Sequence, residues 1–157
     1  MEIDETLVAK KRKYNRGRLV DQQWLFGALE RDSGQFVLAT VDRRDRETLG
    51  ALIRAFIAEE ATVYSDEWPA YMSFFTNQNY NHKTVNHSVN FVSPTDPEVH
   101  TQGIECLWGR LKAFLRKKSY KKRDRLDIYI SEFAFRVNNK EDGAIKMFEL
   151  ILDQLNK

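Results

Sequence analysis

The chain has 157 residues, 42% of them hydrophobic and 12% aromatic, which excludes a largely disordered protein and gives enough length for one domain with a core. Its apolar runs are too short to cross a bilayer and no charged-then-apolar leader opens the chain, so we expect a soluble, intracellular protein without a membrane partner. Cys106 is the only cysteine, which excludes an internal disulfide and a cysteine-built zinc site. We interpret Cys106 as a packing residue.

The formal net charge of +2 conceals two basic segments. Residues 10–18 hold six of the 25 lysines and arginines, residues 110–123 hold eight, and neither segment contains an acidic residue. Phosphate affinity follows local and not total charge, so both segments are candidates for contact with nucleic acid. Solvated surface segments are the alternative interpretation.

The pattern of the first half of the chain predicts three strands, then a helix that crosses over to a fourth strand. Short apolar and β-rich runs indicate the strands, although residues 23–31 alternate poorly, and a turn at Asp32–Gly34 joins two of them in a hairpin. Apolar residues at helical spacing indicate the crossover helix. The expected strands cover residues 2–4, 23–31, 36–41 and 61–65, and the helix covers residues 49–57.

The second half is predominantly helical in pattern. Pro69 suits the first turn of a helix that runs to Phe75, and a short strand is expected around Lys83 to Val85. Apolar stripes over residues 104–115, 126–137 and 145–155 predict three closing helices. We treat 1–157 as a single domain, since no Pro/Gly/Ser-rich linker divides it. The element order predicts an α/β fold with a mixed sheet flanked by helices, as in ribonuclease H-like folds.

Three acidic residues fall where such a fold brings carboxylates to one end of the sheet. Asp4 lies within or at the end of the opening strand, Asp66 directly follows a strand, and Glu105 lies near the start of a helix. Clustered carboxylates are electrostatically costly, and bound Mg²⁺ is the usual way to offset that cost. Each acid also has a plain structural interpretation: an arginine partner for Asp4, a helix cap for Asp66 and a solvated first-turn position for Glu105.

Other polar side chains accompany these acids. Lys112 lies two helical turns after Glu105 on the same face, where its ammonium would meet a phosphate. Trp108, between them, belongs to the apolar stripe and is interpreted as an anchor of the helix to the sheet. His82, His87 and His100 are too few and too irregularly spaced to indicate zinc.

Several motifs in the same order resemble those of the Merlin-type DDE transposases and their ISXO2-like bacterial insertion-sequence relatives. The similar segments span nearly the whole chain. They are EIDET at 2–6, KKRKYNRGR at 10–18, YSDEWPAY at 64–71, VNHS at 85–88, HTQGIECLWGRLK at 100–112 and EFAFR at 132–136.

This resemblance implies a ribonuclease H-like DDE catalytic domain that cleaves transposon ends and joins the freed 3′-hydroxyl to target DNA. It implies Asp4, Asp66 and Glu105 as catalytic, metal-binding residues for two Mg²⁺ or Mn²⁺ ions, with DNA and further copies of the chain as partners. It places the protein in the nucleus of a eukaryote, or in the cytoplasm or nucleoid of a bacterium. The expected DNA contacts are Lys10, Lys11, Arg12, Lys13, Arg16, Arg18, His87, His100, Lys112, Arg116, Lys117 and Lys118.

The chain departs from the family pattern at its start. Met1 lies three residues before Asp4, so we expect a truncated opening strand and no upstream DNA-end-binding domain, and Leu7-Val8-Ala9 stands where relatives often have glycines. Two alternatives therefore stay open. One is a domesticated or decayed transposase-derived DNA-binding protein without catalysis, and the other is a nuclease that hydrolyses strands without joining them.

Overall fold

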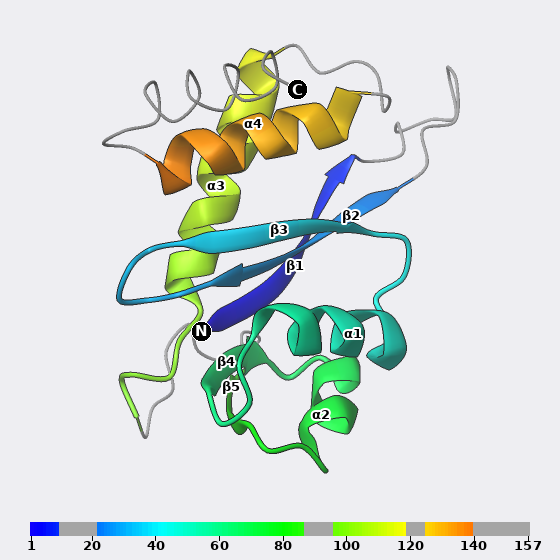
Figure 1. Ribbon diagram of the computed structural model, residues 1–157, viewed down its shortest axis with the longest axis vertical. Helices are drawn as coiled ribbons and strands as arrows, with labels where there is room; N and C mark the ends of the chain where they lie inside the picture. Colours follow the sequence, from blue (N-terminus) through cyan, green and yellow to red (C-terminus); the bar gives the residue numbers. More distant parts are fainter. Residues whose placement is uncertain (10–21, 87–95, 119–124, 140–157) are drawn as a thin grey trace, which may run out of the picture.

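The computed structural model describes residues 1–9, 22–86, 96–118 and 125–139. In this part of the chain, five strands form one mixed sheet and helices cover both of its faces (Figure 1). The elements, in chain order, are β1 (Glu2–Ala9), β2 (Gln23–Leu29), β3 (Phe36–Val41), α1 (Arg46–Phe56), β4 (Thr62–Asp66), α2 (Pro69–Phe75), β5 (Asn81–Val85), α3 (Gln102–Lys117) and α4 (Leu126–Asn138).

The sheet has the strand order β3-β2-β1-β4-β5, so the first strand of the chain lies at its centre. β1 and β3 each pair antiparallel with β2, whereas β1 pairs parallel with β4 and β4 pairs parallel with β5. Gly34, at a φ of 68°, adopts the left-handed conformation in the hairpin between β2 and β3. The expected mixed sheet flanked by helices is confirmed.

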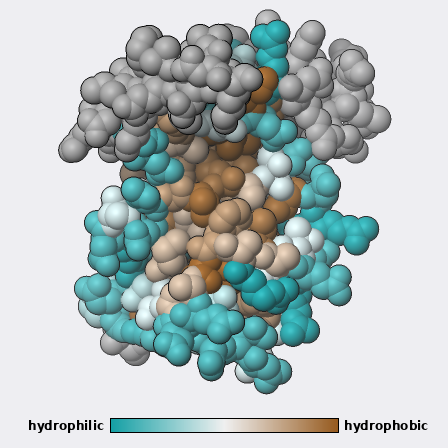
Figure 2. All heavy atoms as spheres, viewed as in Figure 1, coloured by the Kyte–Doolittle hydropathy of each residue, from teal (hydrophilic) through white to brown (hydrophobic). Residues whose placement is uncertain are grey.

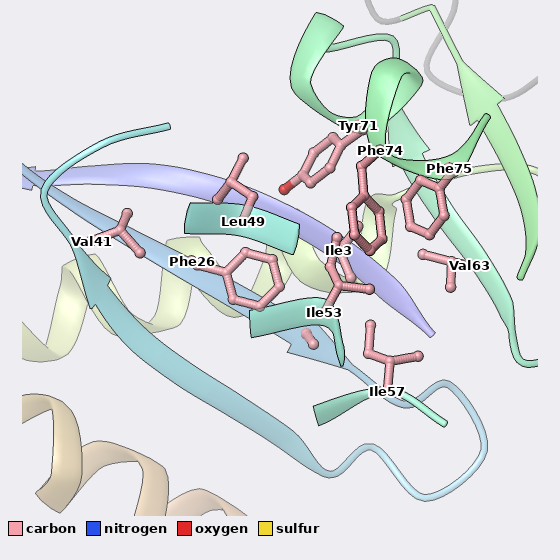
Figure 3. Close-up of a cluster of buried hydrophobic side chains, with 11 residues drawn as sticks. Ile3, Phe26, Val41, Leu49, Ile53, Ile57, Val63, Tyr71, Phe74 and Phe75 are labelled. Carbon is pink, nitrogen blue, oxygen red and sulfur yellow. The ribbon is translucent and has the colours of Figure 1, made fainter. Parts of the chain in front are cut away.

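One core lies between the sheet and the helices α1 and α2. Ile3 of β1 and Phe26 of β2 point toward Ile53 of α1 and Phe74 of α2, and all four side chains are almost fully buried (Figure 3). α1 begins at its N-cap Asp45, whose carboxylate accepts a hydrogen bond of 2.9 Å from the backbone N–H of Thr48. This core fixes the helices on one face of β1.

A second core covers the opposite face of the sheet. Leu25 of β2 and Phe36 of β3 pack there with Trp108 and Leu111 of α3 and with Phe133 of α4. The segment 23–31 lacks clear alternation because consecutive residues of β2 enter different cores, and both cores are apolar. β1 is therefore covered on both faces.

The structure changes some details of the sequence-based expectations. β1 continues five residues past Asp4, so Leu7-Val8-Ala9 is strand, and Asp66 is the last residue of β4 and does not follow the strand. The interpretation of Cys106 as a packing residue is wrong, since the side chain is exposed on α3. The helix expected over 145–155 lies outside the described residues.

Among the described residues, none of the helices has the length and apolar character that crossing a membrane requires. The face drawn in Figure 2 carries hydrophobic side chains over the middle of the sheet, around β3, with hydrophilic side chains around them. Val37 and Leu38 of β3 are partly buried members of the two cores.

Gly50 of α1 provides a test of the packing between α1 and α2. A Cβ at this position would lie 2.5 Å from Cδ2 of Phe74, a ring that is only 2% exposed. Although alanine is the better helix former, we expect Gly50→Ala to lower the free energy of unfolding by about 1–3 kcal/mol through overpacking. Chemical denaturation would measure this change.

Gly109→Ala is the matched control, because Gly109 is an exposed helical glycine of α3 with nothing within 4 Å of the added Cβ. It should raise the free energy of unfolding by ~0.5–1 kcal/mol. Equal gains in both variants would contradict the packing described for α1 and α2.

Candidate active site

Asp4 and Asp66 lie beside each other on neighbouring strands. The parallel register pairs Glu2 of β1 with Tyr64 of β4, and two residues further along each strand come Asp4 and Asp66. Because side chains alternate between the faces of a sheet, both carboxylates belong to the face that α3 covers. The register thus brings together two of the three predicted catalytic acids.

The carboxylate of Asp4 is held in a half-buried position under α3. Its Oδ2 accepts a hydrogen bond of 2.8 Å from the indole Nε1 of Trp108. The indole reaches β1 because Gly27, opposite Asp4 on β2, has no side chain: a Cβ there would lie 2.4 Å from Cη2 of Trp108. The predicted role of Trp108 as an anchor of α3 is confirmed, and it carries a hydrogen bond that the sequence did not indicate.

Burial raises the pKa of Asp4 from 3.8 to about 7. Hydrogen bonds from Trp108 and from the backbone of Glu5 oppose this rise, whereas the negative charges of Glu5 and Asp66 add to it. Two neighbouring carboxylates that are partly desolvated and mutually repulsive are a favourable environment for a divalent cation, and their oxygen ligands are those that Mg²⁺ and Mn²⁺ prefer.

Asp66 makes a contact close to the helix-capping role that was its plain structural interpretation. Its Oδ1 accepts a hydrogen bond of 3.0 Å from the backbone N–H of Trp68, the residue that precedes α2. The carboxylate therefore orders the entry into this helix, although the N-cap position itself belongs to Trp68. This contact uses only one oxygen of Asp66, so it does not move the carboxylate away from Asp4.

Glu105 occupies the first turn of α3, one turn before Trp108. Residues three apart on a helix share a face, so Glu105 lies on the side of α3 that reaches Asp4. Its Oε1 accepts a hydrogen bond of 3.4 Å from the hydroxyl of Thr101. Across the described ranges, no three His, Cys, Asp or Glu side chains form a ready-made ion-binding group, so Glu105 does not join the two aspartates in this structure.

Glu2 is a functional candidate that the sequence analysis missed. It is 1% exposed, and its Oε2 accepts a hydrogen bond of 2.8 Å from the backbone N–H of Ile104, in the first turn of α3. The Nε of Arg31 donates to the other oxygen at 2.8 Å. A Cβ on Gly103 would lie 2.9 Å from Oε2, so a glycine is needed for the helix to approach. Glu2 thus fixes the turn that carries Glu105.

Arg31 extends this contact to the loop before α3. Its guanidinium donates to the carbonyl oxygens of Glu98 at 2.7 Å and His100 at 2.6 Å, and it lies over the ring of Tyr64 at 3.7 Å from the centroid. One cation therefore connects β1, β4 and the segment that leads into α3.

Glu5 is the second buried acid that the sequence analysis missed, and it faces away from α3. Its Oε2 accepts a hydrogen bond of 2.9 Å from Nε of Arg44, and its Oε1 accepts one from the hydroxyl of Tyr71. Burial raises the pKa of Glu5 above its ordinary value. The hydroxyl of Tyr71 points toward β1 in Figure 3. The period of two along EIDET could have separated Glu5 from Glu2 and Asp4, but not named its partners.

The structure places some of the predicted DNA contacts. Arg116 and Lys117 are exposed near the end of α3, and Lys112 is half-buried on the same helix. The Nζ of Lys118 lies 2.8 Å from a carboxylate oxygen of Glu132, so Lys118 links α3 to α4. His100 lies beside Glu2, with Nδ1 3.5 Å from Oε1. Lys10, Lys11, Arg12, Lys13, Arg16, Arg18 and His87 lie outside the described residues.

Replacing Glu2 should destabilise the protein through the start of α3. Glu2→Ala leaves Arg31 and the N–H of Ile104 without their acceptor, and we expect the free energy of unfolding to fall by about 3 kcal/mol. Glu2→Gln keeps an acceptor and should lose less. Glu30→Ala, at an exposed acid beside Arg31 in the turn between β2 and β3, is the control and should change stability little. An equal effect of the Glu2 and Glu30 variants in urea denaturation would contradict this role.

The raised pKa of Asp4 predicts how stability depends on pH in the metal-free protein. Between about pH 4 and about pH 7, the folded chain holds a proton on Asp4 that the unfolded chain releases. Raising the pH in this range therefore lowers the free energy of unfolding. Asp4→Asn lacks this titration. The stability of the wild type relative to Asp4→Asn should therefore fall across that range in denaturation curves recorded with a chelator.

Asp45→Asn is the control for this titration. Hydrogen bonds from Thr48 hold the pKa of Asp45 below its ordinary value, so the stabilisation it gives is lost only in stronger acid. The difference in the free energy of unfolding between Asp45→Asn and the wild type should stay constant across the pH range in which the difference between Asp4→Asn and the wild type changes. A level difference for Asp4→Asn would contradict the burial of its carboxylate.

Solved structures of viral integrases resemble this fold. The integrase catalytic core domain of HTLV-2 in complex with magnesium, in its dimeric form, has a TM-score of 0.58 at 19% identity and covers 88% of this chain and 83% of that one. The catalytic core domain of BIV integrase has a TM-score of 0.56 at 14% identity, over 89% and 82% of the two chains. The chain spans 46% of the simian T-cell lymphotropic virus intasome chain, with a TM-score of 0.57 and 20% identity over 86% of its own length. The expected ribonuclease H-like fold is confirmed.

The sequence comparisons agree with this fold. An uncharacterized transposase-like protein of Haemophilus influenzae is 29% identical over 110 residues, which are 70% of this chain and 84% of that protein. The ISXO2-like transposase domain matches residues 1–138. Since that match covers most of the sequence, the chain belongs to the ISXO2-like transposase domain family.

Proposed function

We propose that this domain is the catalytic core of a metal-dependent DNA transposase, which cleaves transposon ends and transfers the freed 3′-hydroxyl into target DNA. Asp4, Asp66 and Glu105 are its metal-binding carboxylates in this proposal. The observation that carries it is the position of Asp4 and Asp66 side by side on neighbouring parallel strands, on the face that α3 covers. Family membership is the independent support.

The two aspartates fit a divalent cation, Mg²⁺ or Mn²⁺, and three carboxylates would suffice for two ions. The HTLV-2 core domain that resembles this fold was solved with magnesium. When bound, such ions supply positive charge to the attacking and leaving oxygens of a phosphodiester. The chain's own contribution is to hold Asp4 through Trp108 and to keep the first turn of α3 against β1 through Glu2.

Glu105 would complete this set by rotating its side chain away from Thr101. Glu105 lies one helical turn before Trp108, which contacts Asp4, so a change of its side-chain torsions would turn the carboxylate toward the aspartates. Attraction to a cation beside Asp4 and Asp66 is the force that would favour the rotated side chain.

DNA would approach along α3. Lys112, Arg116 and Lys117 follow Glu105 on this helix and would contact phosphates, and the segment 10–18 adds basic charge after β1. We include a homo-oligomer in the proposal, since the HTLV-2 core domains that share the fold were solved in dimeric and trimeric forms. A DNA substrate implies the nucleoid of a bacterium or the nucleus of a eukaryote.

One observation favours the second candidate, a transposase-derived DNA-binding protein without catalysis. Glu105 bonds to Thr101, and the described residues contain no ready-made group of three ion-binding side chains. This candidate predicts binding without cleavage, and a nuclease predicts cleavage without joining. One assay separates all three.

The assay incubates labelled linear DNA that carries transposon ends with the full chain and Mg²⁺ or Mn²⁺. We expect nicking and joining of 3′ ends to a second duplex in the wild type. Asp66→Asn and Glu105→Gln should each lower the nicking rate by at least ~100-fold, because each removes a charged ligand. Gel electrophoresis of the products measures both steps.

Glu59→Gln is the matched control, since Glu59 is an exposed acid between α1 and β4 and outside the proposed metal and DNA contacts. It should keep the wild-type nicking rate. Unchanged products in the Asp66 and Glu105 variants would reject the assigned acids, and binding without nicking in the wild type would favour the second candidate.

The basic residues of α3 predict a salt-dependent affinity for DNA. The logarithm of the association constant should fall linearly with the logarithm of salt concentration, and Arg116→Gln with Lys117→Gln should reduce the slope by about 2. Arg136→Gln removes the same kind of charge from a residue that pairs with Glu132 on α4, and should leave the slope unchanged. Fluorescence anisotropy with a labelled duplex measures it, and equal slopes in all variants would exclude α3 as the DNA contact.

A further inference from the structure

Trp68 is an exposed aromatic residue whose backbone contacts a candidate catalytic acid. The residue is 36% exposed, although tryptophan is usually well covered in folded proteins. It follows Asp66 by two residues, and its backbone N–H donates to Oδ1 of Asp66 at 3.0 Å. The backbone of Trp68 is thereby tied to the carboxylate of Asp66.

The indole of Trp68 is also fixed in orientation. Its Nε1 donates to the carbonyl oxygen of Arg44 at 3.1 Å. The guanidinium of Arg44 lies between two indoles, 4.3 Å from the ring centroid of Trp68 and 4.1 Å from that of Trp24. This guanidinium is anchored in turn by its hydrogen bond to the buried Glu5. The cation therefore covers one face of the Trp68 ring and holds the ring rigidly.

The exposed part of the ring has no polar group left to offer. The indole N–H is already bonded to Arg44, so a ligand on the open surface would be bound by stacking and not by hydrogen bonds. A nucleobase fits this chemistry, because every base has a π-face and stacks without regard to sequence. Bases inside a duplex cover one another's faces, so an unpaired nucleotide is the ligand that offers a free face within a strand.

We propose that Trp68 is a stacking surface for an unpaired base of the strand whose phosphate reacts at Asp4 and Asp66. This inference rests on the proposed function, since it takes DNA as the substrate. It assigns Trp68 a binding role: the ring holds the end of a strand after the duplex has opened, and does not itself act on the reacting atoms.

The test compares two labelled probes in buffer with a chelator, so that no cleavage occurs. One probe is a blunt duplex, and the other is the same duplex with a single-stranded 3′ extension. Trp68→Ala should weaken binding of the extended probe about 5- to 150-fold, the equivalent of ~1–3 kcal/mol for one stacked base, and leave the blunt duplex unchanged. Trp68→Phe keeps an aromatic face and should retain most of the affinity.

Met72→Ala is the matched control, because Met72 is an exposed hydrophobic residue of α2, 46% exposed, without an aromatic ring. It should bind both probes as the wild type does. Thermal unfolding of each variant checks that the protein stays folded when the indole, which contacts Arg44, is removed. As a direct readout, quenching of tryptophan fluorescence by the extended probe should diminish in Trp68→Phe.

Equal affinities of Trp68→Ala and the wild type for the extended probe would overturn the inference. So would an equal loss for both probes, or a loss in Met72→Ala as large as that in Trp68→Ala. The binding assay needs no cleavage, so its result is independent of the nicking assay. If nicking survived in Asp66→Asn and Glu105→Gln, the catalytic assignment would be rejected. The preference of Trp68 for the extended probe could still be observed in that case.

Discussion

The structure depends on how one central strand accommodates three carboxylates within four residues. β1 is covered on both faces, so Glu2, Asp4 and Glu5 all lose water on folding, and each needs compensation. In the described part of the chain, Glu2 and Glu5 pair with Arg31 and Arg44, whereas Asp4 receives hydrogen bonds from neutral donors. Asp4 is therefore the acid of β1 whose charge a bound cation would offset.

The same compensation places the helices. Glu2 accepts from the backbone of α3, and Glu5 accepts from Tyr71 of α2, so the two buried acids attach helices to opposite faces of β1. The close approach of α3 to the sheet requires glycine at two positions. A Cβ on Gly27 would collide with Trp108, and a Cβ on Gly103 would collide with Glu2. Stability and site geometry therefore depend on the same contacts, and a change at Glu2 would move Glu105 as well as weaken the fold.

The sequence predicted most of the elements because its periodicities were strong. The stripe over 104–115 became α3 and the run 36–41 became β3, since a helix or strand that buries one face must repeat its apolar residues at a fixed spacing. Boundaries were less certain: β1 continues to Ala9 because pairing with β2 extends it, which no local pattern of EIDET announces. Cys106 was misinterpreted because a cysteine without a catalytic partner in the sequence is commonly a packing residue, whereas its position on α3 faces outward.

By itself, the sequence determined the order of elements, the family motifs and the three acids to examine, because these follow from local spacing and from residue identity. Only the tertiary structure decided which acids meet and which are neutralised. The register between β1 and β4 sets Asp66 beside Asp4, and the approach of α3 gives Asp4 its indole partner and Glu2 its backbone partner. Such contacts join residues more than sixty positions apart, and they depend on strand register and helix packing, which no short stretch of sequence encodes.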